Sequence, residues 1–172
     1  MKLVLISLIT ALLPTAAYGQ GSKVDTPVFS NKAVYTYTGR PALSPDRQKS
    51  VVTRSVRTDK DEDFPTEIVV RIGKEKLTSK IRFGLNAEVL WSPDSSAFAV
   101  TGSRDGANGL YWTDVFIINQ TGLTKVPLSQ AIWHAFGHPV RCGWPEDPNV
   151  GAIKWIDGSS RLLVELFYFQ SL

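Results

Sequence analysis

The chain has 172 residues, of which 43% are hydrophobic and 20% charged, and its formal net charge at pH 7 is +3. This composition is typical of a soluble globular protein that is long enough to bury a core. Cys142 is the single cysteine, which excludes an intramolecular disulfide, and the small charge excess does not predict a nucleic-acid partner.

The first nineteen residues predict a secretory signal peptide. Lys2 precedes an apolar run over residues 3–13, and Pro14 and several small residues follow before Gln20. This layout is typical of an export signal, with cleavage after Gly19 or Ala17. The run is shorter than the roughly 20 apolar residues that a spanning helix needs, and no later stretch is longer. We therefore expect a periplasmic or secreted protein without a membrane span.

Residues 20–42 form an N-terminal extension with one predicted strand. The alternating stretch "VYTYT" at residues 34–38 carries the period of two that is typical of a half-buried strand.

A short motif then recurs along the chain. "LSPDRQKSVVTRS" at residues 43–55 aligns without a gap with "WSPDSSAFAVTGS" at residues 91–103, 48 residues later, and "WIDGSSRLLVELF" at residues 155–167 keeps part of the pattern. Proline fixes φ near −65° and the aspartate carboxylate accepts N–H groups of the turn, so each motif predicts a tight turn before a strand. The predicted turn residues are Pro45, Asp46, Pro93, Asp94, Asp157 and Gly158.

A predicted β-hairpin follows each of the first two motifs. Residues 66–81 and 113–128 each contain a β-branched strand, a short polar turn and a second strand. Four strands per unit, at a period in the forties, indicate the blades of a β-propeller. We predict an all-β fold of antiparallel four-stranded blades, without helical periodicity after the signal peptide. The units are a blade at 43–83, a blade at 88–132, an insertion loop at 133–149 and a partial blade at 150–172.

The motif of the second unit resembles the repeat of TolB-like β-propellers. "WSPDSSAFAVTGSRDG" and the later strand "DVFIIN" match that repeat, whose turn carries a glycine after the aspartate. Ser95 and Arg47 replace this glycine, and Gly158 retains it in the third unit. The resemblance implies a propeller fold, which hosts binding proteins as well as the propeller portions of peptidases.

Two blades and a partial third are fewer than the four to eight that close a propeller. Three explanations stay open: a fragment of a longer protein, self-association that completes the propeller, or an open stack of blades. The basic residues between Arg71 and Arg82 are expected on a solvated sheet face.

Candidate chemistry is sparse. His134, His138 and Cys142 recur at intervals of four, which would suit a metal site on a helix, but Gly137, Pro139 and their neighbours favour a loop. The chain has no nucleophile elbow and no phosphate-binding glycine loop, so we predict no catalytic residue and no cofactor.

Aromatic residues give the best indication of a binding surface. Trp91 and Trp155 occupy equivalent repeat positions and are expected between blades. The insertions at 105–113 and 133–149 carry further aromatic residues, which are favoured at interfaces; these are Tyr111, Trp112, Trp133 and Trp144.

These observations favour an exported, non-catalytic binding or scaffolding module for a protein or a small ligand. Two alternatives stay open. One is the N-terminal propeller portion of a longer secreted hydrolase, and the other is a small periplasmic metal-binding protein.

Overall fold

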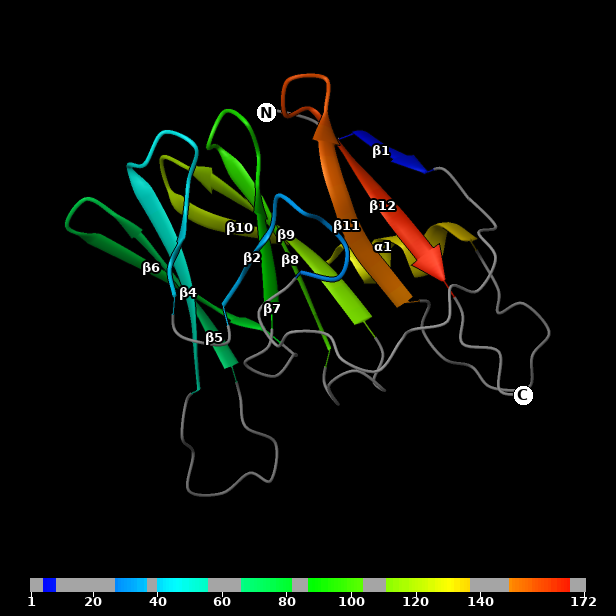
Figure 1. Ribbon diagram of the computed structural model, residues 1–172, viewed down its shortest axis with the longest axis horizontal. Coiled ribbons are helices and arrows are strands. Elements are labelled where there is room, and N and C mark those ends of the chain that lie inside the picture. The colour runs from blue at the N-terminus through cyan, green and yellow to red at the C-terminus, as the bar shows by residue number, and fades with distance from the viewer. Residues whose placement is uncertain are drawn as a thin grey trace.

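The computed structural model describes residues 5–8, 27–36, 40–55, 66–81, 87–103, 111–136 and 149–167. Within these ranges the chain is mostly β-sheet, as the sequence predicts, and it forms three sheets that stand next to one another (Figure 1). The expected antiparallel pairing is confirmed for every strand pair but one.

The first sheet has four strands in the order in which they occur in the chain. They are β3 (Ala42–Leu43), β4 (Lys49–Ser55), β5 (Thr66–Ile72) and β6 (Glu75–Ile81). The β5–β6 hairpin turns at Gly73, whose φ of +57° lies in the left-handed region that glycine adopts without a steric penalty.

The second sheet repeats this order and adds a strand from the N-terminal extension. Its strands are β7 (Ala87–Trp91), β8 (Ala97–Ser103), β9 (Tyr111–Asn119) and β10 (Gly122–Val126), with β2 (Val34–Tyr35) paired to β7. The predicted strand at 34–38 is therefore present at its start, and residues 37–39 lie outside the described residues.

The third sheet is smaller. β11 (Asn149–Ile156) pairs with β12 (Arg161–Phe167), and β1 (Leu5–Leu8) pairs with the other edge of β12 in the parallel direction. The apolar run of the predicted signal peptide thus supplies an edge strand to this sheet.

Two apolar cores hold the three sheets together. The first lies between the first and second sheets and includes Ile68, Val70 and Phe98. The second lies on the opposite face of the second sheet, against the third, and includes Ala99, Val150 and Leu162. All residues of β7 and β8 are buried, because the second sheet has a core on each face.

The outer face of the first sheet carries charged residues around the apolar pair Val52 and Val69. Alternate residues of its strands face the first core, and the residues between them include Arg71, Lys76 and Lys80, which are exposed, and an ion pair of Arg54 with Glu67. The expected solvated basic face is present in this part of the sheet.

One helix corrects the expectation of a fold without helices. α1 (Leu128–Phe136) follows β10 and buries Leu128 and Ile132 in the second core. This apolar pair, four residues apart, is the helical signal, but nine residues are too few for the periodicity to stand out. The glycine and prolines that argue against a helix begin only at Gly137.

The N-terminal extension is fixed to the second sheet by a buried carboxylate. Glu88 in β7 accepts hydrogen bonds from the backbone N–H groups of Val28 and Phe29. Burial raises the pKa of Glu88, and the bonds from the extension oppose that rise. Residues 28 and 29 are therefore held at β7, and the extension helps to form the site described next.

Candidate functional site

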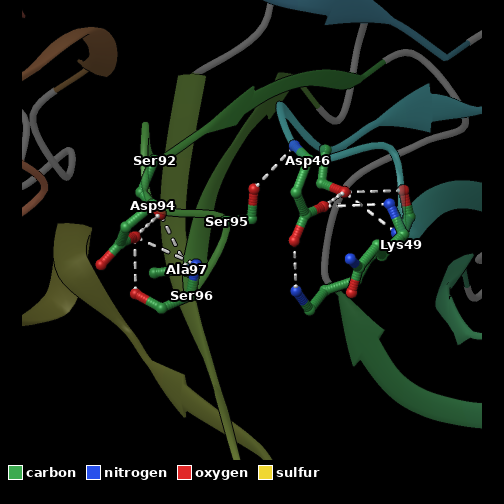
Figure 2. Close-up of polar contacts among 9 residues, drawn as sticks. Asp46, Lys49, Ser92, Asp94, Ser95, Ser96 and Ala97 are labelled. Carbon is green, nitrogen blue, oxygen red and sulfur yellow. Dashed lines mark hydrogen bonds and ion pairs between the residues drawn. The ribbon is translucent and has the colours of Figure 1, made fainter.

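The first two repeat turns have the same hydrogen bonds (Figure 2). Asp46 Oδ1 accepts from the Ser44 hydroxyl at 2.5 Å and from the Gln48 N–H at 3.0 Å. Asp94 Oδ1 accepts from the Ser92 hydroxyl at 2.7 Å and from the Ser96 N–H at 3.0 Å. The Ser-Pro-Asp sequence thus closes each turn by its own side chains.

Asp46 has an additional partner, because Lys49 Nζ lies 3.0 Å from its Oδ2. The Ser44 hydroxyl, followed by the Gln48 N–H and Lys49, holds the pKa of the Asp46 carboxyl well below its ordinary value.

The residue after each aspartate adopts a left-handed conformation. Arg47 has φ of 59° and Ser95 has φ of 60°, at the positions where the repeat of TolB-like propellers has glycine. The third turn has the same length, since Trp155 pairs with Leu162 as Trp91 pairs with Phe98, and Asp157, Gly158 and Ser159 all have positive φ.

Side chains of one turn bind the backbone of the preceding turn. Ser95 Oγ accepts from the Asp46 N–H at 3.1 Å, as Figure 2 shows, and Ser159 Oγ accepts from the Asp94 N–H at 3.0 Å. The sheets are therefore joined turn to turn by a serine at the fifth residue of the motif.

The tryptophan at the first position of the second and third motifs forms another hydrogen bond to the preceding sheet. Trp91 Nε1 donates to the Ala42 carbonyl at 3.0 Å, and Trp155 Nε1 donates to the Leu90 carbonyl at 3.1 Å. Each acceptor directly precedes the first residue of the preceding motif. In the first motif, Leu43 and Arg47 occupy the tryptophan and serine positions, and neither side chain can make these bonds.

A pocket of about 250 Å³ opens where these links gather. It is lined by residues of all three sheets and of the N-terminal extension: Lys32, Val34, Leu43, Pro45, Val89, Leu90, Trp91, Pro93, Lys154 and Trp155. This volume lies below the roughly 300–1,000 Å³ of pockets for drug-sized ligands, so only a small ligand would fit.

The charged side chains of the pocket lining are both lysines. Lys32 and Lys154 are exposed, and within the described part of the chain neither forms an ion pair. The lining contains no Asp, Glu, Asn, Gln, Ser or Thr, so no lining side chain can accept a strong hydrogen bond.

The aromatic residues of the expected binding surface are placed differently. Trp112 is half-buried against the first core, and Tyr111 is half-buried and meets Phe29 edge-on at 5.0 Å between ring centroids. Trp133 lies in α1, and Trp144 lies outside the described residues. Of the equivalent pair expected between blades, Trp91 is buried and Trp155 is half-buried.

The candidate metal ligands are not brought together in the described part of the chain. His134 belongs to α1, and His138 and Cys142 lie outside the described residues. Among the residues that the structure describes, no group of three His, Cys, Asp or Glu side chains could hold a metal ion, and no helix is long and apolar enough to cross a membrane.

Lys32 and Lys154 were not candidates from the sequence. Isolated lysines in polar stretches carry no motif, and only the meeting of the three sheets places them at one pocket. No family model, curated protein or solved structure matches the chain, so no relative supplies a function for it.

Proposed function

We propose that the protein is an exported, non-catalytic binding module built from propeller-type blades, two of them complete and the third partial. The equivalent links by tryptophan and serine, made twice between successive sheets, support this repeat architecture. TolB-like propellers are the family that such a module resembles.

The pocket at the three repeat turns is the proposed binding site. The observation that carries this proposal is that equivalent positions of the repeats meet there: Leu43, Trp91 and Trp155 at the first position, and Pro45 and Pro93 at the third. An apolar concave surface with a few polar groups at its rim is the usual form of a small-molecule site.

A variant that fills the pocket tests this function. Leu43 is 54% exposed and lines the pocket, so Leu43→Trp should occupy the space without disturbing a core. A mixture of anionic, neutral and cationic aromatic fragments is offered to the protein, and binding is followed by saturation-transfer NMR. We expect at least one fragment to bind the wild type and not to bind Leu43→Trp.

Val28→Trp is the matched control, because Val28 is 50% exposed and does not line the pocket. This variant should retain the fragments. Equal binding to Leu43→Trp and to the wild type would contradict the assignment of the site.

A further inference from the structure

We infer that the pocket selects a small organic anion with an apolar body, for which a carboxylate is the simplest charged group. This inference rests on the proposed function and adds the chemical class of the ligand. It follows from the donors and acceptors that the pocket walls present.

The walls of the pocket accept an apolar body. Two indole rings, two prolines and the side chains of Val34, Leu43, Val89 and Leu90 provide the lining. A volume of about 250 Å³ is larger than the roughly 150 Å³ of an engineered cavity that binds benzene, so a single ring with a short substituent fits.

The indole N–H groups are not available to a ligand. Trp91 Nε1 and Trp155 Nε1 already donate to backbone carbonyls of the preceding sheet. The remaining side-chain donors of the lining are the ammonium groups of Lys32 and Lys154, which come from the extension and from β11.

The lining disfavours cations and polyols. The charged residues of the lining are two lysines and include no carboxylate that could pair with a cationic ligand, and a sugar would find no side-chain acceptor for its hydroxyl groups. An anion, in contrast, pairs with ammonium groups that no described carboxylate neutralises. The charge of the pocket and its apolar walls thus select the same ligand class.

Three probes of similar size separate charge from shape: phenylacetate, benzyl alcohol and phenethylamine. Each is titrated into the ¹⁵N-labelled protein, and the indole N–H signals of Trp91 and Trp155 are followed, with Trp155→Phe used for assignment. We expect phenylacetate to shift both signals and to bind about three- to tenfold more tightly than benzyl alcohol. Phenethylamine should bind more weakly than either.

Charge removal at the pocket provides the second measurement. Lys32→Gln and Lys154→Gln should each weaken phenylacetate binding about three- to fivefold and should weaken benzyl alcohol binding less. Lys74→Gln is the matched control, because Lys74 is an exposed lysine in the β5–β6 turn and does not line the pocket. All three variants should keep the circular dichroism spectrum of the wild type.

The outcomes distinguish this inference from the proposed function. If benzyl alcohol or phenethylamine binds as tightly as phenylacetate, the anion preference is overturned, but the pocket remains a binding site. An equal loss of phenylacetate binding in Lys74→Gln would likewise overturn the role of Lys32 and Lys154. If no probe shifts either indole signal, the inference and the proposed site both fail.

Discussion

Individual residues of the repeat turns each perform a separate structural task. Asp46 and Asp94 close the turn from within, whereas Ser95 and Ser159 bind the turn that precedes them. Replacing one of these residues therefore affects either the local turn or the contact between sheets, and the two effects can be measured separately.

Arg47→Gly should stabilise the protein. Arg47 has φ of 59°, a conformation that costs an L-residue roughly 1–2 kcal/mol, and its side chain makes no link to another turn. Because glycine loses more backbone entropy on folding, we expect a net gain of about 0.5–1 kcal/mol in the free energy of unfolding, measured by urea denaturation. Arg71→Gly, in the extended strand β5, is the control and should be destabilising. A loss of stability in Arg47→Gly would contradict the assigned strain.

Asp46 should make the stability of the protein depend on acid pH. The pKa of this carboxyl is lowered in the folded chain, so its stabilising effect is present above its unfolded pKa of about 3.9 and is lost as the pH falls through the folded value. The free energy of unfolding of the wild type should therefore fall below pH 4 more steeply than that of Asp46→Asn.

Lys49→Met distinguishes the causes of this pH dependence. The Ser44 hydroxyl is the largest single cause of the lowered pKa of Asp46 and the Gln48 N–H is the next, so Lys49→Met should retain part of the acid-dependent loss. Denaturant unfolding at pH 7, 4 and 3 measures both variants. Identical pH profiles for Asp46→Asn and the wild type would count against the hydrogen-bonded carboxylate.

At the scale of the elements, the indole hydrogen bonds between sheets come from strands that lead into the repeat turns. β3, β7 and β11 lead into the three turns, and the tryptophans that end β7 and lie near the end of β11 donate to the preceding sheet. The cores supply most of the apolar contact, and the indole bonds fix how far each sheet slides along its neighbour.

Trp155→Phe should loosen the third sheet. This change removes the bond from Nε1 to the Leu90 carbonyl, and we expect a loss of about 1–2 kcal/mol in the free energy of unfolding. Trp112→Phe is the control, because Trp112 is also half-buried and its indole makes no hydrogen bond within the described residues. Faster amide hydrogen exchange in β11 should accompany the loss in Trp155→Phe only. Equal losses would assign the effect to packing alone.

At the scale of the whole molecule, the three sheets lie side by side, and the first and third sheets differ in the surfaces that they leave at the two ends of the row. The outer face of the first sheet carries the charged residues Arg54, Arg71, Lys76 and Lys80 around the buried Val69. The first motif also lacks the tryptophan and serine that would bind a preceding turn. At the other end, the edge of β12 is paired with β1 from the predicted signal peptide.

Export with cleavage should leave the three sheets folded. The paired register of β1 with β12 covers four residues, whereas β11 and β12 pair along most of their length and bury Val150, Leu162 and Val164 in the second core. We expect the exported protein to begin at Gln20 or Tyr18, measured by intact mass spectrometry, and to unfold cooperatively within about 5 °C of the full chain.

The same experiment should reveal an exposed sheet edge. Without β1, the edge of β12 has unpaired backbone groups, so the processed chain should associate more at high concentration in light scattering than the full chain. Loss of cooperative unfolding after removal of residues 1–19 would show that β1 is part of the fold rather than a removable edge.

The sequence by itself determined the β class, the antiparallel hairpins and the turns at Asp46 and Asp94. These features depend on contacts within a few residues, since the proline, the serine and the aspartate of each motif close the turn on their own. α1 was missed because its two buried residues, Leu128 and Ile132, acquire meaning only against the second core.

Only the tertiary structure decided where the candidate site lies. Leu43, Trp91 and Trp155 share the first position of the repeated motif, but that position does not by itself predict a pocket, and Lys32 belongs to no motif. These residues meet because successive sheets are linked turn to turn. The same packing half-buries Tyr111 and Trp112, which the sequence had favoured as a binding surface. A turn is local and can be read from its residues, whereas a pocket between sheets exists only after their faces have packed.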